Sequence, residues 1–385
     1  MMKICIITGA RAEYGLLRPL IEKIGKDDYL ELQIVVTGMH LSPEFGFTYT
    51  EINTDGYEIN EKIEILLSSD TPVGIAKSMG LAMISFSECY ERIKPDTIIL
   101  LGDRYEIFAA VSVASVSRIP VVHLHGGEVT QGAIDEVFRH SITKMSYLHF
   151  TSTEEYRQRV IQLGEEPERV FNVGAIGIEN IKNMKLLSKQ DFQKSVSFKL
   201  GVRNILVTFH PVTLEDNTSK EQFGNLLRAI EHFEDLNVIF TKANSDTNGR
   251  IINQMIDKYV ERNPVKSIAF ISMGQLRYLS AIQYVDAVVG NSSSGIIEVP
   301  SFKKPTINIG DRQKGRIQAN SIINCRPVED EIYRSLVTVF SNEYKEKLVN
   351  VTNPYGDGKV SDKIIKEIKK RLNKEVDLKK GFYDL

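Results

Sequence analysis

The sequence predicts an α/β protein of two domains, each with a parallel sheet. Short runs of β-branched and other apolar residues alternate with longer stretches of helical period, which is typical of repeated β-α units. This pattern runs through the first half of the chain and begins again after Val173-Gly174. The length of 385 residues agrees with two domains rather than one small module.

Strands of the first half are predicted from apolar runs that end in polar or glycine-containing residues. These runs cover residues 3–8, 32–37, 97–101 and 120–125. The same criterion in the second half selects residues 205–209, 238–240, 287–289 and 306–309.

A polar stretch over residues 182–199 separates the two series and marks the expected domain boundary. We therefore predict a first domain over residues 1–180, a second over 181–360, and a C-terminal helix and tail over 361–385. Ile364, Ile365, Ile368 and Leu372 recur at a spacing that forms one helix face. This helix is expected to pack back on the first domain, and the lysine-rich tail near Lys379 and Lys380 to be a solvated end.

The composition excludes several classes of partner. Lys and Arg total 48 against 50 Asp and Glu, a net charge of −2, so no general field is expected to hold nucleic acid or an anionic membrane. No apolar run approaches the roughly 20 residues of a membrane span, and the start lacks the features of a secretory signal. Three widely spaced cysteines argue against a disulfide framework or a zinc site. A cytoplasmic protein is expected.

Ligands of parallel α/β sheets gather beyond the carboxyl ends of the strands, so residues just after each predicted strand are candidates for function. The turn over residues 8–15 carries Arg11 and Ala12 and could present backbone N–H groups to an anion, or it could be only a tight connection. Gly102-Asp103-Arg104 follows the strand over 97–101 and reads either as a surface ion pair or as part of a site, with Tyr105 opening the next helix.

The next predicted strand runs into His123-Leu-His125-Gly-Gly-Glu128. In a strand His123 and His125 would share one face, and the glycines would allow close approach of a ligand. A metal site would need a further ligand that this pattern does not supply. Asp135 and Arg139 lie four residues apart, on one face of a predicted helix, as a surface pair or as an acid held by an arginine.

In the second domain, His210 precedes Pro211 at a strand end, so a stiff corner would project an imidazole whose ordinary pKa, near 6.5, suits proton transfer. The run from Gly290 to Glu298 leads from a strand through Asn291, three serines and Gly295 into a helix. Such a turn suits a diphosphate, although serines there also serve as helix caps. Arg312 follows the last strand and could supply a cation to the same phosphates.

In this order the motifs resemble those of hydrolysing UDP-N-acetylglucosamine 2-epimerases of sialic acid biosynthesis. The resemblance extends from residue 3 to about residue 316 and rests on GxRAEYG, GDRYEI, HxHGGE, DEVFRHSITK, FHPVT, GNSSSGIIEVP and INIGDRQKGR. It implies a fold like that of GT-B glycosyltransferases, in which two Rossmann-like domains face each other across a cleft.

The resemblance also implies roles for individual residues. UDP and its sugar are expected to contact Arg11, Ala12, Arg104, His125, Asn291, Ser292, Ser293, Ser294, Gly295, Glu298 and Arg312. Proton transfer and charge stabilisation are expected from Asp103, Glu128, Asp135, Arg139 and His210. Related non-hydrolysing epimerases carry a glutamate where this chain has His125, so either His125 or Glu128 could take over its proton transfer.

The implied reaction converts UDP-N-acetylglucosamine and water into N-acetylmannosamine and UDP through a 2-acetamidoglycal. The C2 proton has no neighbouring carbonyl and becomes acidic only as UDP leaves, so the leaving diphosphate must be stabilised first. We expect Asp135 or Asp103 to act at C2, His210 to assist the diphosphate and Glu128 to activate water. No redox cofactor is expected, because elimination and addition leave the oxidation state unchanged. The reaction demands no metal, although magnesium could accompany UDP.

Four alternatives stay open. The same chemistry could act on UDP-N,N′-diacetylbacillosamine, one acetamido group away, which these motifs do not distinguish. A non-hydrolysing epimerase would add UDP back, a glycosyltransferase would need an acceptor, and a nucleotide-sugar sensor would not catalyse. A homodimer is expected from the resemblance and from the general frequency of two-fold symmetry.

Overall fold

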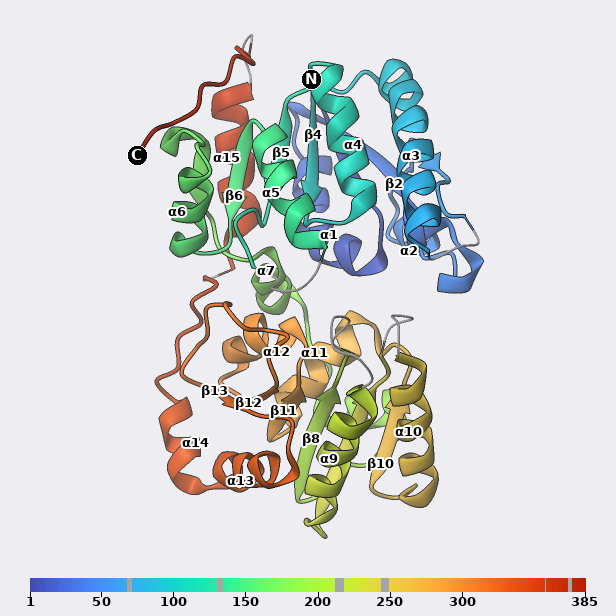
Figure 1. Cartoon of the computed structure of the whole chain (residues 1–385), viewed down its shortest axis with the longest axis vertical. Coiled ribbons are helices and arrows are strands. Elements are labelled where there is room, and N and C mark those ends of the chain that lie inside the picture. The colour runs from blue at the N-terminus through green and yellow to red at the C-terminus, as the bar shows by residue number, and fades with distance from the viewer. Residues whose placement is uncertain (68–70, 130–133, 212–217, 244–248, 357, 373–375) are drawn as a thin grey trace. The chain divides into compact units, whose positions relative to one another are not determined.

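Two compact units, each with its own sheet, make up the chain in the computed structural model (Figure 1), which describes residues 1–67, 71–129, 134–211, 218–243, 249–356, 358–372 and 376–385. Unit 1 contains residues 1–128, 134–180 and 355–385, and unit 2 contains Val129 and residues 181–354 among those described. All strand pairs of both sheets are parallel, which confirms the predicted α/β class.

The sheet of unit 1 has the order β3-β2-β1-β4-β5-β6-β7. Its strands are β1 (Met2–Thr8), β2 (Leu30–Thr37), β3 (Glu61–Ile63), β4 (Thr97–Leu101), β5 (Val121–Leu124), β6 (Leu148–Thr151) and β7 (Val170–Asn172). The sequence analysis located β1, β2, β4 and β5. It missed β3, β6 and β7, because these strands are only three or four residues long and include polar residues such as His149.

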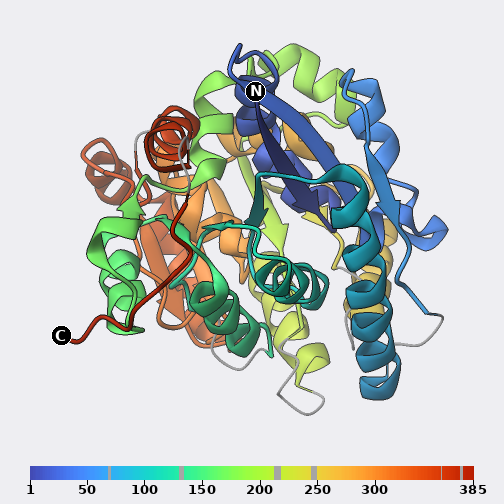
Figure 2. The same cartoon turned by 90° about the horizontal axis from the view of Figure 1, so that it is seen from above.

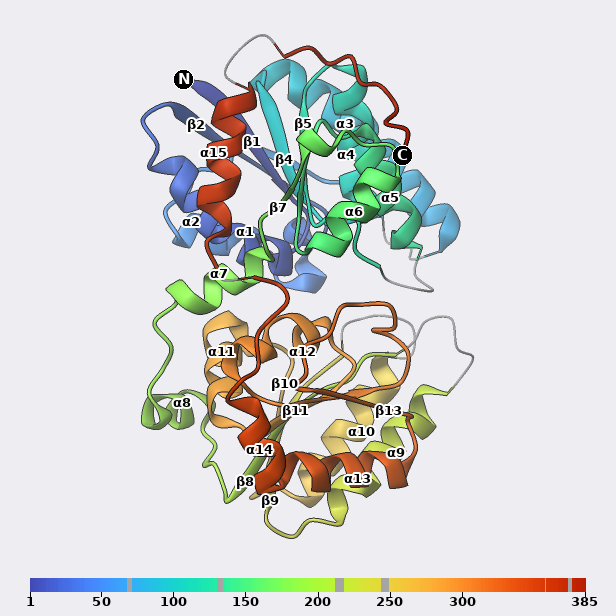
Figure 3. The same ribbon diagram turned by 90° about the vertical axis from the view of Figure 1, so that its left-hand side faces the viewer.

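Helices cover both faces of this sheet. Figure 3 shows α1 and α15 on one face and α3, α4 and α5 on the other. The helices of unit 1 are α1 (Arg11–Gly25), α2 (Tyr49–Thr54), α3 (Pro72–Ile93), α4 (Tyr105–Val116), α5 (Asp135–Met145), α6 (Glu154–Gln162), α15 (Val360–Leu372) and the first five residues of α7 (Ile176–Asn183), with 3-10 turns at Gly38–Leu41, Pro43–Phe45 and Pro167–Arg169.

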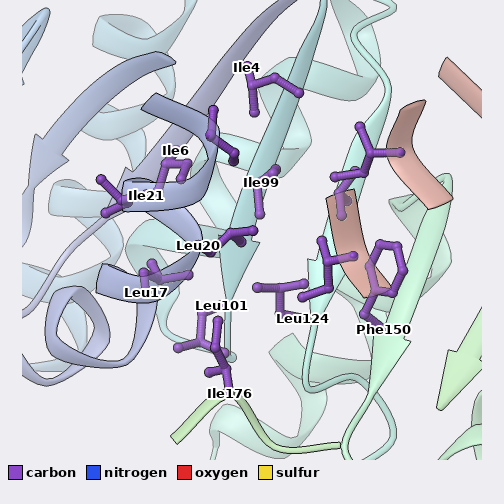
Figure 4. Packing of buried hydrophobic residues seen from close by; sticks show 14 of the residues in the cluster. Ile4, Ile6, Leu17, Leu20, Ile21, Ile99, Leu101, Leu124, Phe150 and Ile176 are labelled. Carbon is purple, nitrogen blue, oxygen red and sulfur yellow. The ribbon is translucent and has the colours of Figure 1, made fainter. Parts of the chain in front are cut away.

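The core beneath α1 follows from the spacing of its apolar residues. Leu17, Leu20 and Ile21 recur at three- and four-residue intervals and are fully buried. They pack in one cluster with Ile6 of β1 and Ile99 of β4, as the close-up shows (Figure 4). This packing holds the start of α1 directly beyond the end of β1.

The C-terminal helix α15 packs on unit 1, as predicted. Its buried residues Ile364, Ile368 and Leu372 belong to the same core cluster as α1. Glu179 anchors the start of the helix, since its Oε2 atom accepts hydrogen bonds from the backbone N–H and the hydroxyl of Ser361, both at 2.7 Å.

The tail after α15 is only partly the solvated end that was predicted: Lys379 and residues 381–385 are exposed, but Lys380 is held against the unit. The ammonium group of Lys380 lies 2.5 Å from Oε2 of the fully buried Glu165. It also donates to the backbone carbonyls of Lys144 and Ser146 at 2.7 Å, at the end of α5. Figure 2 shows the dark red tail running beside the green helix α6.

Unit 2 repeats the same topology, with the strand order β10-β9-β8-β11-β12-β13. Its strands are β8 (Arg203–Thr208), β9 (Leu236–Thr241), β10 (Ser267–Phe270), β11 (Ala287–Gly290), β12 (Thr306–Ile309) and β13 (Ile322–Cys325). The sequence analysis missed the two edge strands, β10 and β13.

The helices of unit 2 again lie on two faces (Figure 3). They are α8 (Lys189–Val196), α9 (Ser219–Glu231), α10 (Gly249–Arg262), α11 (Gly274–Tyr284), α12 (Ser293–Ile297), α13 (Glu329–Phe340) and α14 (Asn342–Leu348), with a 3-10 turn at Val299–Phe302. Among the helices of the described residues, none is long and apolar enough to cross a membrane.

Candidate active site

In both units the candidate residues lie where the strand order reverses, at the carboxyl edge of the sheet. In unit 1 the chain connections reverse direction between β1 and β4, and in unit 2 between β8 and β11. Such switch points at the carboxyl edge of a parallel sheet are preferred ligand sites. Asp103 and Arg104 follow β4, and His210 and Asn291 follow β8 and β11.

Arg139 is the centre of a charge cluster in unit 1. It projects from α5, is 3% exposed, and pairs through one guanidinium nitrogen with Asp103. Its other terminal nitrogen lies 2.6 Å from Oε2 of Glu136 and donates to the backbone carbonyl of Glu128 at 2.8 Å. A buried guanidinium with these partners fixes the end of β4 against α5 and the turn after β5.

Asp135 begins α5, one turn before Arg139. Burial, followed by the charge of Asp103, raises the pKa of the Asp135 carboxyl above its ordinary value. Asp103 in contrast is held by the guanidinium of Arg139. A buried carboxyl group whose pKa is raised in this way is suited to carry a proton.

The prediction that His123 and His125 share one strand face was wrong. β5 ends at Leu124, and His125 adopts a left-handed backbone with φ of 66°. Gly127 continues the turn with φ of 77°, and any side chain there would meet the Tyr156 carbonyl oxygen at 2.5 Å. The turn brings the side chain of Glu128 next to the ring of His125, and Nδ1 of the ring lies 3.1 Å from Oε1 of Glu128.

His123 instead lies within the unit and has no exposed surface. Its ring nitrogens contact the Gly102 carbonyl at 2.8 Å and the Thr143 hydroxyl at 3.2 Å. Burial lowers the pKa of His123 to about 3, so the ring is neutral near pH 7. No group of three or more metal-ligating side chains occurs in the described part of the chain.

Arg104 caps a second charged cluster at the start of α4. Its Nε atom lies 2.5 Å from Oε1 of Glu106, which is fully buried. Glu13 accepts a hydrogen bond from the backbone N–H of Gly9 at 2.7 Å. Burial, followed by the charge of Glu106, raises the pKa of Glu13 to about 8, so this region holds a proton near neutrality.

Arg11 and Ala12 form the first turn of α1 and are exposed. Arg11 pairs with Glu51 of α2, with 2.6 Å between Nε and Oε1, and its side chain is 42% exposed. The structure therefore places Arg11 beyond the end of β1 but in contact with an acidic partner.

In unit 2, Asn291 joins the ends of two strands. Its amide oxygen accepts the backbone N–H of His210 at 2.7 Å, and its amide nitrogen donates to the His210 carbonyl at 2.8 Å. Burial, with the charge of Arg312 second, lowers the pKa of His210 to about 4. The pKa of His210 thus lies below the ordinary value of an imidazole, and the ring is neutral near pH 7.

The serine run after β11 serves in part as a helix cap. Ser292 is the N-cap of α12, and its hydroxyl accepts the backbone N–H of Ser294 at 3.4 Å. The Ser294 hydroxyl in turn is bound to Glu298 and receives a hydrogen bond from Tyr278 at 2.9 Å. Ser293 and Gly295 lie within α12, which is five residues long.

Glu298 directly follows α12, and burial raises the pKa of its carboxyl group. Arg312 follows β12 and donates to the backbone carbonyl of Asn291 at 3.1 Å. Gln313 donates to the same carbonyl at 2.9 Å and is 3% exposed. The ends of β8, β11 and β12 are thus joined by Asn291, whose side chain binds His210 and whose backbone carbonyl binds Arg312 and Gln313.

Glu13, Glu136, Gln313 and Ser152 belong to these clusters or contact them, but they were not predicted from the sequence. Glu136 could have been found, because it lies three residues before Arg139 on the same helix. Gln313 adjoins the predicted Arg312, but nothing in the sequence shows that it turns inward. Ser152 donates to Oε1 of Glu128 at 2.8 Å, and it follows β6, a strand that was not predicted.

Comparisons with known proteins agree on one family. The profile of a family described as UDP-N-acetylglucosamine 2-epimerase matches residues 22–369. The chain is 46% identical over 383 residues to the "GDP/UDP-N,N′-diacetylbacillosamine 2-epimerase (hydrolyzing)" of Campylobacter jejuni, covering 100% of this chain and 99% of that protein. It is 39% identical to "Polysialic acid biosynthesis protein P7" of Escherichia coli, covering 100% and 98%.

Solved structures share the fold. The UDP-GlcNAc 2-epimerase of Neisseria meningitidis, bound to UDP-GlcNAc, superposes with a TM-score of 0.83 at 18% identity, covering 96% of this chain and 100% of that one. At this identity the comparison supports the architecture.

Proposed function

Because the chain belongs to the UDP-N-acetylglucosamine 2-epimerase family, we propose that it is a hydrolysing 2-epimerase whose substrate is UDP-N,N′-diacetylbacillosamine. The observation that carries the proposal is the 46% identity, over the full length of both chains, to a hydrolysing epimerase named for this sugar. UDP-N-acetylglucosamine, which the sequence analysis put first, becomes the second candidate. The 39% identity to a polysialic acid biosynthesis protein keeps it in consideration.

The proposed reaction releases UDP and a free sugar that is inverted at C2. UDP leaves, a carboxylate takes the C2 proton to form a 2-acetamidoglycal, and water then adds across the C1–C2 double bond. Asp135 is suited to carry a proton, because its pKa is raised by burial and by Asp103. Asp103 pairs directly with the guanidinium of Arg139.

Unit 2 is proposed to bind the nucleotide diphosphate. Arg312 and the neutral ring of His210 come together beyond the ends of β12 and β8, around Asn291. Ser292, Ser293 and Gly295 are proposed to donate from the turn after β11, and Glu298 to accept from the ribose. Arg11, Ala12, Arg104 and Ser294 remain candidate substrate contacts. We also propose a cytoplasmic homodimer, which light scattering and cell fractionation would test.

The decisive experiment is turnover in heavy water. The purified protein is incubated with UDP-N,N′-diacetylbacillosamine and, separately, with UDP-N-acetylglucosamine, and products are followed by NMR. We expect free UDP and a sugar with deuterium at C2, formed faster from the diacetamido substrate. UDP-sugar epimer without UDP release would identify a non-hydrolysing epimerase, and no deuterium at C2 would exclude an epimerase.

Asp135→Asn provides the matched test of the proton carrier. Removing a general acid or base lowers kcat by about 100- to 10,000-fold, so the variant should be nearly inactive while its melting temperature stays close to that of the wild type. Near-normal turnover by the folded variant would refute the assignment of Asp135.

A further inference from the structure

We propose that Glu128 transfers a proton in the reaction and that His125 and Ser152 are positioning residues that hold its carboxylate. This inference rests on the proposed function and concerns whether His125 or Glu128 transfers the proton, an alternative that the sequence left open. Its basis is the hydrogen bonding of the imidazole ring, which leaves only one neutral tautomer compatible with the structure.

Both ring nitrogens of His125 have partners. The backbone N–H of Ile176, at the start of α7, donates to Nε2 at 3.3 Å, so Nε2 is an acceptor and carries no hydrogen. A neutral ring must then carry its hydrogen on Nδ1, which lies 3.1 Å from Oε1 of Glu128. His125 is therefore a donor to Glu128, and the nitrogen that would act as a base is already hydrogen-bonded.

Ser152 supplies the second donor to the same oxygen. Its hydroxyl lies 2.8 Å from Oε1 of Glu128, and it is 1% exposed. Glu128 itself is 5% exposed, and its backbone carbonyl accepts a hydrogen bond from Arg139 at 2.8 Å. His125 and Ser152 thus hold one oxygen of the carboxylate, and Arg139, which also pairs with Asp103, holds the backbone of the same residue.

The backbone of His125 is consistent with a positioning role. A left-handed conformation is uncommon for residues other than glycine, and such conformations persist where the surroundings impose them. Here the turn places Glu128, three residues later in the chain, next to the ring of His125. An extended backbone at His125 would not allow this placement.

The proposed step is hydration of the glycal. As the water oxygen bonds to C1, one water proton passes to the Glu128 carboxylate. The electron pair of the C1–C2 double bond takes a proton from a carboxylic acid such as Asp135, and UDP has already left. No oxidant or metal is required for the atoms and electrons to balance.

His125→Asn separates positioning from proton transfer. The asparagine amide can donate to Glu128 from nearly the same place as Nδ1, asparagine tolerates the left-handed backbone, and it has no basic nitrogen. We expect kcat of H125N to stay within about tenfold of the wild type, as for the loss or weakening of one hydrogen bond. E128Q should lose about 100- to 10,000-fold. If folded H125N is as inactive as E128Q, His125 is the base and the proposal is wrong.

Ser152 has its own pair of variants and a control. S152A should lower kcat by up to about tenfold with little change in KM, and S152T, which keeps the hydroxyl, should restore it. Ser146 is an equally buried serine of unit 1 whose hydroxyl donates to the Ile142 carbonyl at 2.7 Å. S146A should leave kcat unchanged, and an equal loss in S146A and S152A would contradict a positioning role.

Nitrogen NMR of the imidazoles tests the inference without any substrate. His125 is assigned as the signal that H125N lacks among the seven histidines. A hydrogen on Nδ1 is expected, and a hydrogen on Nε2 would overturn the proposal. If the wild type turns over neither nucleotide-sugar, the proposed function is refuted. The NMR result on the His125 ring does not depend on turnover, so failure of the proposed function can be told apart from failure of the inference about Glu128.

Discussion

Asn291 shows how one buried amide can organise a site at the residue scale. The sequence analysis counted it among substrate contacts, but both ends of its side chain bind the backbone of His210. Its own carbonyl accepts hydrogen bonds from Arg312 and Gln313. Gly290 makes this junction possible, since any side chain there would lie 1.9 Å from the Thr208 carbonyl oxygen. We therefore propose that Asn291 orients His210 and Arg312.

Replacing Asn291 by alanine should lower both stability and turnover. Leaving the buried polar groups of His210 without partners costs about 1–3 kcal/mol of unfolding free energy. Asn204 is a matched control, because it is also buried and binds the N–H and carbonyl of Gly201 at 2.8 and 3.1 Å. The measurements are denaturant unfolding and kcat of both variants. We expect both to be destabilised, and the loss of kcat to be clearly larger in N291A than in N204A.

At the scale of elements, the C-terminal segment holds unit 1 together by two different means. α15 buries apolar residues against the core that α1 shares. The tail inserts Lys380 beside Glu165, which also binds Lys144 at 2.6 Å and the buried His149 at 2.9 Å. Burial opposes charge on Glu165, yet His149 and the two lysines lower its pKa to about 2. The ammonium group of Lys380 in the tail thus helps to compensate the buried carboxylate of Glu165 at the end of α5. The same helix carries Asp135 and Arg139.

Lys380→Met should destabilise the protein by about 3 kcal/mol, because removing one partner leaves a buried carboxylate less compensated. Lys379→Met changes the neighbouring lysine, for which the described contacts involve only its backbone. Chemical unfolding of both variants is the measurement. K379M should match the wild type, and equal stability of K380M and K379M would show that the buried pair contributes nothing net.

At the scale of the whole molecule, buried neutral imidazoles make folding sensitive to acid. His40 and His123 have no exposed surface, and burial lowers their pKa to about 4 and about 3. An unfolded histidine takes up its proton near pH 6.5. Between pH 6.5 and 4 these two histidines therefore bind protons in the unfolded chain but stay neutral in the folded chain. Stability from these groups is complete above pH 6.5 and falls as the pH is lowered.

His40→Asn tests this at one site. The ring of His40 contacts the hydroxyls of Thr8 at 3.1 Å and Thr48 at 2.8 Å, and an amide retains hydrogen-bonding capacity without titrating. The unfolding free energy of the wild type should fall with decreasing pH more steeply than that of H40N, by at most about 1.4 kcal/mol per pH unit between 6.5 and 4. Equal slopes would mean that His40 is not a neutral buried group.

Much of the fold could be predicted from local pattern. Long apolar strands such as β1 and β2 and the apolar face of α15 carry their own periodicity, and the parallel sheets follow from the alternation of strands and helices. Short strands could not be found this way. β6 is four residues long and contains a histidine and a threonine that are buried only because neighbouring strands and Glu165 enclose them.

By itself, the sequence determined which residues follow the strands, and therefore which side chains are available for chemistry at the carboxyl edges of the sheets. Only the tertiary structure decided how those side chains are used. His125 was predicted to lie in a strand, but its left-handed backbone places its ring next to the carboxylate of Glu128. Asn291 binds the backbone of His210, which lies 81 positions earlier in the chain. The physical reason is that a hydrogen bond depends on distance and direction in space, which folding sets between residues far apart in the chain.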